Sequence, residues 1–391
     1  MRGPMKLIKE KGGQNLQEEL SITRRDFLKA GIGAAIGTAA APLMPQGTSW
    51  GEVKPLIPQL FDASIIPVVS VVQIKNDQLA YAVEKAMDLL GGIGTVTKSK
   101  EKIMLKPNLL AADPRYTTNP AVVKILAQML KKSGKEVLIG EGSAAASDFN
   151  IKGTEVYRTK NRKILDGMQK FVYEKLGYVD LAKSLGVPLI NLHSGDMVDV
   201  PVSNGYVFNK ITLNRSLTDI DLLCSVPMMK THSLATVTLG MKNLIGVYPG
   251  TVYYSVRAWL HDQAHGRGSP GVAYETIDVV KANKLGLTII DASWAVEGQG
   301  PTMPGKRFKM NLIVAGTNPL ATDMVAAKIM GFEISEIATF AWAHNAGMKP
   351  IAVDEIEVRG AKISDVKKEF LKPNVRPWPA INKVWGAKEI I

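Results

Sequence analysis

The segment Lys230-Thr231-His232 holds the residue types best suited to catalysis in this chain. A lysine ammonium can hold a carboxylate or a phosphate, and a histidine can move a proton near neutral pH. Residues two positions apart face the same side of an extended backbone. We therefore predict that Lys230 and His232 are catalytic, the alternative being a solvated loop that follows a strand.

A second set of polar residues is suited to ligand binding. The set consists of Lys106, Asn108, Glu141, Ser143, Lys242 and Asn243. Lys242-Asn243 interrupts an apolar segment, where buried polar side chains need partners, either a ligand or an adjacent loop. The segment from Gly140 to Ala145 fits the dinucleotide pattern G-x-G-x-x-A. Glu141 would place a carboxylate beside the phosphates, so a tight turn or a ligand loop is favoured over a nucleotide site.

Two carboxylates follow another apolar segment. Glu297 is a candidate catalytic acid or base with Asp291 as its partner, and Asp291 with Glu141 is a candidate divalent-metal pair. The structural alternative is that Asp291 caps a turn. Asp323 lies in the first turn or so of an expected helix, where the helix dipole favours an acid, so we expect a structural role.

The single cysteine, Cys224, limits the choice of cofactor. One cysteine allows no internal disulfide and no cysteine-ligated iron–sulfur cluster. Cys224 lies in an apolar segment and is expected to be a core residue. His261 and His265 have the i, i+4 spacing of a metal pair on a helix, but the glycines that follow favour a mobile loop. The cofactor stays unknown, with a divalent metal as a candidate.

Alternating strands and helices are expected to position these residues. Strands are predicted over 102–105, 136–139, 187–192, 221–226, 287–290, 311–315 and 355–358, and helices over 79–90, 120–132, 169–185 and 319–330. Residues 193–220 and 248–280 are expected to be irregular. The alternation predicts an α/β fold with a doubly wound, mostly parallel sheet and helices on both faces. Ligands bind such sheets beyond the carboxyl ends of the strands, where the candidate residues fall.

Helix caps support this interpretation. Asn119-Pro120 and Asn318-Pro319 combine an N-cap residue with proline at the first helical position, and Gly134 and Gly331 can end the two helices. Asp77 is the expected cap of the helix over 79–90.

The first 51 residues resemble an export address. Thr23-Arg24-Arg25-Asp26-Phe27-Leu28-Lys29 has the form of a twin-arginine signal, and the apolar stretch 30–41 that follows is too short to span a bilayer stably. Cleavage is expected before Glu52 or after 39–41. The expected division is a signal peptide over 1–51, an α/β domain over 52–372 and an irregular tail over 373–391. We expect transport of the folded protein by the twin-arginine translocase to the periplasm or cell exterior.

Net charge is the remaining feature of composition. The chain has 48 basic and 36 acidic side chains, a formal charge of +12, of which residues 1–51 contribute +3. Aromatic residues make up 6%, and no basic stripe with interleaved aromatics occurs. We expect no nucleic-acid partner, no stable membrane span after processing, and a small anionic ligand instead.

Several motifs in combination carry a family resemblance. These are Lys106-Pro107-Asn108, Gly140-Glu141-Gly142-Ser143, Lys230-Thr231-His232, 241–246, 297–301 and 318–323. Together, over about Val71 to Pro373, they resemble the DUF362 family, a widespread prokaryotic domain of unassigned function. Some relatives carry a ferredoxin-like cysteine cluster, which this chain lacks.

The sequence thus predicts an exported enzyme or cofactor-dependent redox protein, such as an oxidoreductase, acting on a small anion at the carboxyl edge of the sheet. The alternative is an exported ligand- or metal-binding module without turnover.

Overall fold

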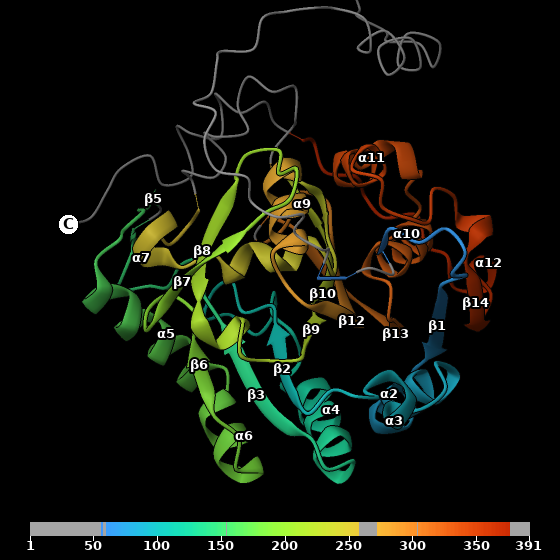
Figure 1. Cartoon of the computed structure of the whole chain (residues 1–391), viewed down its shortest axis with the longest axis horizontal. Helices are drawn as coiled ribbons and strands as arrows, with labels where there is room; N and C mark the ends of the chain where they lie inside the picture. Colours follow the sequence, from blue (N-terminus) through green and yellow to red (C-terminus); the bar gives the residue numbers. More distant parts are fainter. Residues whose placement is uncertain (1–55, 58–59, 154, 258–271, 303, 376–391) are drawn as a thin grey trace, which may run out of the picture. The chain divides into compact units, whose positions relative to one another are not determined.

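The predicted α/β alternation is present in the computed structural model, which describes residues 56–57, 60–153, 155–257, 272–302 and 304–375 (Figure 1). Within these residues a sheet of ten strands forms, eight of them in the order β14-β1-β13-β12-β9-β2-β3-β6. The bounds along this order are β14 (Glu357–Gly360), β1 (Val68–Gln73), β13 (Lys306–Gly316), β12 (Leu285–Glu297), β9 (Leu222–Val226), β2 (Lys102–Pro107), β3 (Glu136–Glu141) and β6 (Leu189–Asn191). The two other strands are β10 (Met228–His232) and β11 (Thr236–Thr238).

Most neighbouring strands are parallel, as predicted. Only β13 runs against its two neighbours β1 and β12 along this order, while the pairs from β12 through β6 are parallel. β10 pairs parallel with β12 and antiparallel with β11. The carboxyl ends of β2, β3 and β9 therefore meet at one edge.

Helices cover both faces of the sheet. The larger ones are α2 (Leu79–Leu89), α4 (Pro120–Lys132), α5 (Arg162–Lys175), α6 (Tyr178–Leu185), α9 (Ala273–Lys281), α10 (Pro319–Ile329) and α11 (Ala338–Asn345). Along β13, Ile313 and Ala315 pack in the hydrophobic cluster with α2, α4, α5 and α6, whereas Leu312 and Val314 pack in the cluster with α9, α10 and α11. This alternation makes the sheet the middle layer of three.

Two of the three predicted helix caps are present, and the prediction for the third helix is wrong. Asn119 accepts a hydrogen bond from the Ala121 N–H, and Asn318 accepts one from the Ala321 N–H. Gly134 and Gly331 follow these helices with positive φ. Asp77, however, has φ of 55° and makes no cap, since α2 begins after Gln78 with no side-chain hydrogen bond.

Other elements differ from the sequence-based expectation. The single helix predicted over 169–185 is two helices, because Gly177 with φ of 76° separates α5 from α6. Residues 193–220 are not wholly irregular, since β7 (Met197–Pro201) and β8 (Lys210–Asn214) form an antiparallel pair. Residues 248–280 include α7 (Gly250–Tyr253) and α9. The segment after β9, for which both an extended backbone and a solvated loop were considered, is strand β10.

Some predictions lie outside the described residues. These are the signal at 23–29 with its cleavage sites, the histidine pair His261 and His265, and the tail beyond 375. Just before and within the described part of the tail, Leu371 donates its N–H to Glu297 and Asn374 donates its N–H to Gln299. No helix of the described residues is long and apolar enough to cross a membrane.

Candidate functional site

A cavity of about 210 Å³ lies beyond the carboxyl ends of β2 and β3, and we call it the site cavity. Seven of the predicted residues line it: Lys106, Asn108, Glu141, Lys230, His232, Lys242 and Asn243. Thr238 and Arg257 line it as well, and apolar side chains such as Leu110, Leu234 and Ile245 complete the wall. The prediction that these motifs converge at one edge of the sheet therefore agrees with the geometry.

Lys106 and Glu141 form a buried ion pair at this edge. Their strands β2 and β3 are parallel neighbours, and the Lys106 Nζ lies 2.8 Å from Glu141 Oε1. The same Oε1 accepts the Gly142 N–H and Oε2 accepts the Leu109 N–H, both at 2.8 Å. With both oxygens accepting, Glu141 acts as an anchor for Lys106. Burial lowers the pKa of Lys106, while Glu141 works in the opposite direction.

Asn243 links Lys106 to Asn108. Its Oδ1 accepts from Lys106 Nζ at 3.2 Å and from Asn108 Nδ2 at 3.0 Å, and its Nδ2 donates to Ser225 Oγ at 3.0 Å. Since an ammonium can only donate, Lys106 fixes the orientation of the Asn243 amide and, through it, that of Asn108. Asn108 Oδ1 is left buried without a partner in the described structure, and so is Thr238 Oγ1. Two lining residues thus offer polar atoms to a ligand.

Strand β10 places Lys230 and His232 on one side of an extended backbone, as predicted. Thr238 on β11 lies opposite Lys230 in the pairing register. Lys230 is fully buried and its Nζ donates to the Tyr116 carbonyl at 2.6 Å. Burial first, and then the charge of Lys242, hold the pKa of Lys230 well below its ordinary value.

His232 has a defined tautomer in its neutral form. Its Nδ1 accepts the Leu234 N–H at 3.0 Å, so the ring proton lies on Nε2. The side chain is 9% exposed and lines the site cavity. Nε2–H is therefore the group with which the neutral form of this histidine can donate a hydrogen bond.

Lys242 begins the 3-10 helix η3 (Lys242–Val247). Within the described structure its Nζ makes no hydrogen bond or ion pair. Burial, and then the positive charges of Lys106 and Arg257, lower its pKa to about 7. This amine is therefore partly neutral at physiological pH.

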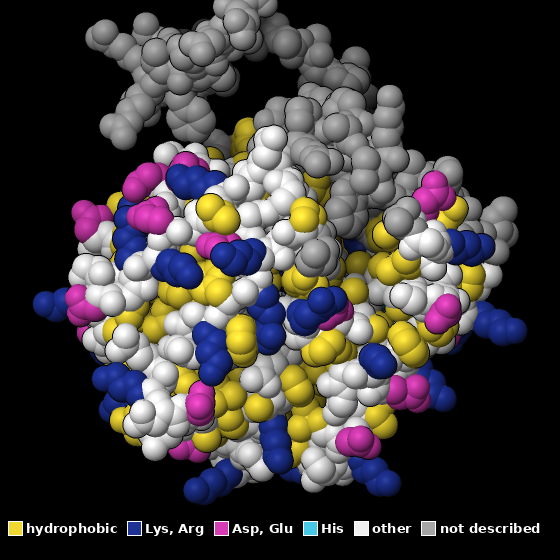
Figure 2. All heavy atoms as spheres, turned by 180° about the vertical axis from the view of Figure 1, so that it is seen from behind, with side chains coloured by type: hydrophobic (Ala, Val, Ile, Leu, Met, Phe, Trp, Pro, Cys, Tyr) yellow, Lys and Arg dark blue, Asp and Glu magenta, His cyan; other side chains and the backbone are white. Residues whose placement is uncertain are grey.

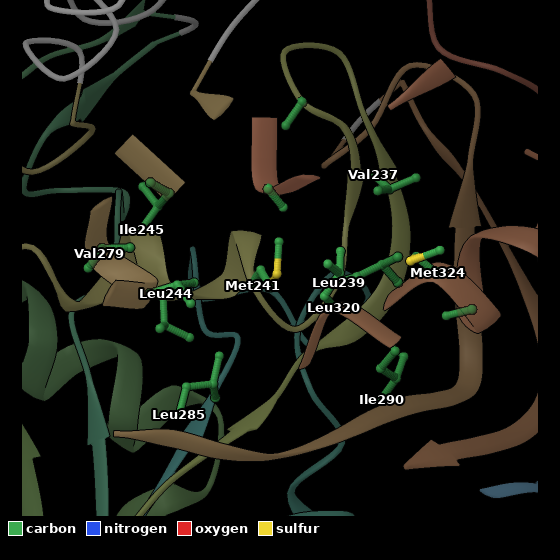
Figure 3. Packing of buried hydrophobic residues seen from close by; sticks show 14 of the residues in the cluster. Val237, Leu239, Met241, Leu244, Ile245, Val279, Leu285, Ile290, Leu320 and Met324 are labelled. Atoms are coloured by element: carbon green, nitrogen blue, oxygen red, sulfur yellow. The ribbon is translucent and has the colours of Figure 1, made fainter. Parts of the chain in front are cut away.

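Long-range contacts hold η3 in place. Asp323 on α10 accepts the Gly240 N–H at 2.7 Å and the Met241 N–H at 2.8 Å. Met241 and Leu244 belong to the large hydrophobic cluster, drawn in Figure 3 with side chains of β12, α9 and α10. The start of η3 is thus fixed beside the cavity. Burial raises the pKa of Asp323 to about 7.

Arg257 is the main residue that the sequence analysis missed. Its guanidinium donates to the carbonyls of Gly142 at 2.7 Å, Tyr248 at 3.0 Å and Gly246 at 3.1 Å. Burial lowers its pKa to about 10. The residue lies in a segment expected to be irregular, and no spacing or neighbouring motif marks it.

Two glycines allow these groups to approach one another. A Cβ at Gly246 would lie 2.5 Å from Glu141 Oε1 and 2.7 Å from Lys106 Nζ, and one at Gly142 would lie 2.7 Å from an Arg257 nitrogen. Neither glycine has a positive φ. Gly142 is thus required for space rather than for a special turn.

Three predicted residues do not line the site cavity. Ser143 accepts through its carbonyl from Arg257 and lies at 2.7 Å from His193 Nε2, so its backbone supports the wall. Asp291 was expected at a strand end, but β12 continues to Glu297, and its carboxylate accepts the N–H groups of Asn119 and Ser293. Glu297 accepts the Leu371 N–H. These carboxylates hold neighbouring backbone in place.

A metal site gains no support from this geometry. Among the described residues, no three His, Cys, Asp or Glu side chains form a group that could hold a metal ion. Glu141 faces the Lys106 ammonium, and Asp291 is not among the residues of the cavity wall. The metal pair stays a prediction from the sequence. Cys224 is fully buried in β9, and burial raises its thiol pKa, as fits a core residue.

The fold and the cavity define an α/β protein with a mostly parallel sheet and a basic pocket beyond its strand ends. Residues 103–328, more than half of the chain, match the family model described as Domain of unknown function (DUF362), so the chain belongs to this family. A thylakoid-associated protein of Synechocystis sp. is 28% identical over 271 residues, which cover 68% of this chain and 75% of that protein.

Two solved structures are more distantly similar. The lactate racemase apoprotein from Thermoanaerobacterium thermosaccharolyticum is 15% identical with a TM-score of 0.41, over 69% of this chain and 58% of that one. A protein from Thermotoga maritima is 15% identical with a TM-score of 0.37, over 64% of this chain and 58% of that one.

Proposed function

We propose that the protein is an enzyme that binds a small organic anion in the site cavity and moves a proton on it. One observation carries the proposal: among the described residues, four basic side chains line the cavity with one carboxylate, and Lys106 already pairs with that carboxylate. An anion would supply the missing negative charge. The unpartnered Asn108 Oδ1 and Thr238 Oγ1 add polar contacts for its other groups.

His232 is the proposed acid or base. It lines the same wall as Lys230, and the proton of its neutral ring lies on Nε2. Lys242 and Arg257 are the proposed anion-holding cations, while Lys106 is held by Glu141. Glu141 is proposed as a positioning residue rather than as a base, because both of its oxygens accept hydrogen bonds.

Binding is tested by calorimetric titration with butanoate and inorganic phosphate. We expect at least one of them to bind, and Lys242→Met to weaken that binding by roughly tenfold or more, since a charge-assisted contact contributes about 1.5–3 kcal/mol. Lys170→Met is the matched control, because Lys170 is exposed on α5 and its removal changes the net charge equally. Binding of neither anion, or equal weakening by both variants, would contradict the proposal.

Turnover is tested by NMR in deuterated water with 2-oxobutanoate, 2-hydroxybutanoate and 2-aminobutanoate. We expect the protein to exchange a carbon-bound proton of one of these acids, and His232→Ala to stop the exchange while still binding the acid. Binding without any exchange would favour a binding module over an enzyme.

We also propose export of the folded protein by the twin-arginine translocase. The support is the twin-arginine pattern at 23–29 with the apolar stretch after it. The proposed destination is the periplasm or the cell exterior.

A further inference from the structure

We propose that the Lys242 amine forms an imine with the carbonyl carbon of a small oxo acid bound in the site cavity. The inference rests on the proposed anion site and adds its nucleophile and its substrate class. It follows from how Lys242 differs from the two other lysines that line the cavity.

The three lysines differ first in the hydrogen-bond partners of their ammonium groups. Lys106 Nζ has three, namely Glu141, Asn243 and the Pro107 carbonyl, and Lys230 Nζ donates to the Tyr116 carbonyl at 2.6 Å. Lys242 Nζ has no such partner among the described residues, although it borders the same cavity. Its amine is therefore the one of the three that is not committed to the protein.

The second step is the protonation state of Lys242. A nucleophilic amine must be neutral, and neighbouring cations and burial favour the neutral form. Lys106 and Arg257 act in this direction on Lys242, whose pKa is about 7. Asp323 and the packing of Met241 fix the backbone directly before it. A partly neutral amine is thus held at a fixed place in the wall.

The third step is the proton balance. As the amine lone pair attacks the carbonyl carbon, the C–O double bond becomes a single bond, and the oxygen, which accepts a hydrogen bond from His232 Nε2–H, takes one of the two amine protons. The nitrogen lone pair then expels the hydroxyl, which takes the second amine proton and leaves as water. One amine and one carbonyl give one imine and one water, with no oxidant or reductant. In the proposal, His232, whose Nδ1 accepts the Leu234 N–H, donates this hydrogen bond through Nε2–H.

The fourth step is the substrate class. The amine requires a carbonyl group, the remaining cations require an acid group, and the cavity of about 210 Å³ limits the size. The apolar side chains Leu110, Leu234 and Ile245 suit a short hydrocarbon chain. A 2-oxo acid with a small alkyl group combines these features, and 2-oxobutanoate is a suitable probe.

The experiment treats the full-length protein with 2-oxobutanoate and cyanoborohydride, which reduces an imine to a stable amine, and maps the adduct by peptide mass spectrometry. We expect one predominant adduct, on Lys242. Lys242→Arg is the matched variant, because it keeps a cation for the acid group but cannot form an imine. It should lose the adduct and still bind butanoate.

Different outcomes test the imine on Lys242 and the anion site. Butanoate binding without an adduct on Lys242, or adducts spread over exposed lysines, would overturn the imine and leave the anion site standing. Failure of both butanoate and 2-oxobutanoate to bind would overturn the anion site itself. Thermal melting of Lys242→Arg checks that the variant is folded.

Discussion

The three lysines of the site cavity differ in how their charge is held. Lys106 has a carboxylate partner at 2.8 Å, Lys230 has a carbonyl partner, and Lys242 lacks both within the described structure. A carboxylate favours the charged form, whereas burial and neighbouring cations favour the neutral form. Glu141 therefore opposes the effect of burial on the pKa of Lys106, whereas burial and neighbouring cations both lower the pKa of Lys242, to about 7.

The titration of Lys242 predicts how anion binding depends on pH. Its pKa of about 7 means that the ammonium is present below this pH and lost above it. An anion prefers the ammonium, so butanoate affinity should fall as pH rises through about 7, by roughly tenfold in all. Calorimetry at several pH values measures this. Lys242→Arg stays charged and should bind with little pH dependence, and a parallel decline in both proteins would contradict the assignment.

The Lys106–Glu141 pair predicts a stability effect at the residue scale. Removing one member of a buried ion pair leaves the other charge uncompensated, at a cost of about 3–5 kcal/mol. Glu141→Gln should lower the free energy of unfolding by about this amount in urea titrations. The double variant Lys106→Met with Glu141→Gln should lose less than the sum of the single variants. Additive losses would show that the two side chains do not depend on each other.

Seven of the cavity residues can be identified from the sequence, whereas Arg257 cannot. The seven follow predicted strands or lie in a polar interruption of an apolar segment, and such local patterns can be recognised in a single sequence. Arg257 contacts carbonyls from 142 to 248, so its place depends on long-range packing that no local pattern encodes. Asp291 was misplaced for a related reason, because antiparallel pairing with β13 extends β12 beyond it.

At the scale of elements, η3 is held against the strand ends so closely that Gly246 has no room for a side chain. We predict that Gly246→Ala abolishes or weakens butanoate binding by at least roughly tenfold, because its Cβ would displace the Lys106–Glu141 pair. Gly94→Ala is the control, since a Cβ there meets nothing within 4 Å. Calorimetry and circular dichroism together separate lost binding from lost folding. Unchanged affinity in folded Gly246→Ala would contradict the proposed cavity.

Asp323 joins α10 to η3 and predicts a pH-dependent stability. Its pKa is raised from 3.8 to about 7, so the folded state favours the protonated acid. The contribution of Asp323 to stability is therefore complete below about pH 4 and is lost as pH rises through about 7. The stability advantage of the natural protein over Asp323→Asn should shrink across this range. Unfolding in urea at several pH values measures it, and a constant or growing advantage would contradict the raised pKa.

Helices whose ends are marked by capping residues could be predicted from the sequence. Strands that depend on pairing with distant strands could not. Asn119-Pro120 and Asn318-Pro319 start α4 and α10 as expected, since capping depends on a few consecutive residues. The sequence left open whether residues 230–232 are extended or form a solvated loop, and the strand character of β10 comes from pairing with β11 and β12. The antiparallel direction of β13 relative to β1 likewise depends on tertiary pairing, which no local sequence pattern encodes.

At the scale of the whole molecule, charged side chains are spread over the face that Figure 2 shows, while four basic side chains line the cavity. Figure 2 shows Lys and Arg side chains over the visible face with Asp and Glu among them. A dispersed surface charge is not the continuous basic stripe that nucleic acid binding uses. Cations from β2, β10, η3 and the segment after α7 instead meet at one cavity, where they can act together on a small anion.

The cavity exists only once distant parts of the chain have folded together, from Lys106 to Arg257, so the proposed route of export is that of a folded protein. We predict that replacing Arg24 and Arg25 by lysine leaves the protein in the cytoplasm, while the natural signal delivers it across the membrane. Cell fractionation and mass spectrometry of the N-terminus measure location and cleavage. Lys9→Arg is a control within the same segment that leaves the pair intact. Equal export of both variants would contradict the twin-arginine assignment, because that pathway reads the arginine pair.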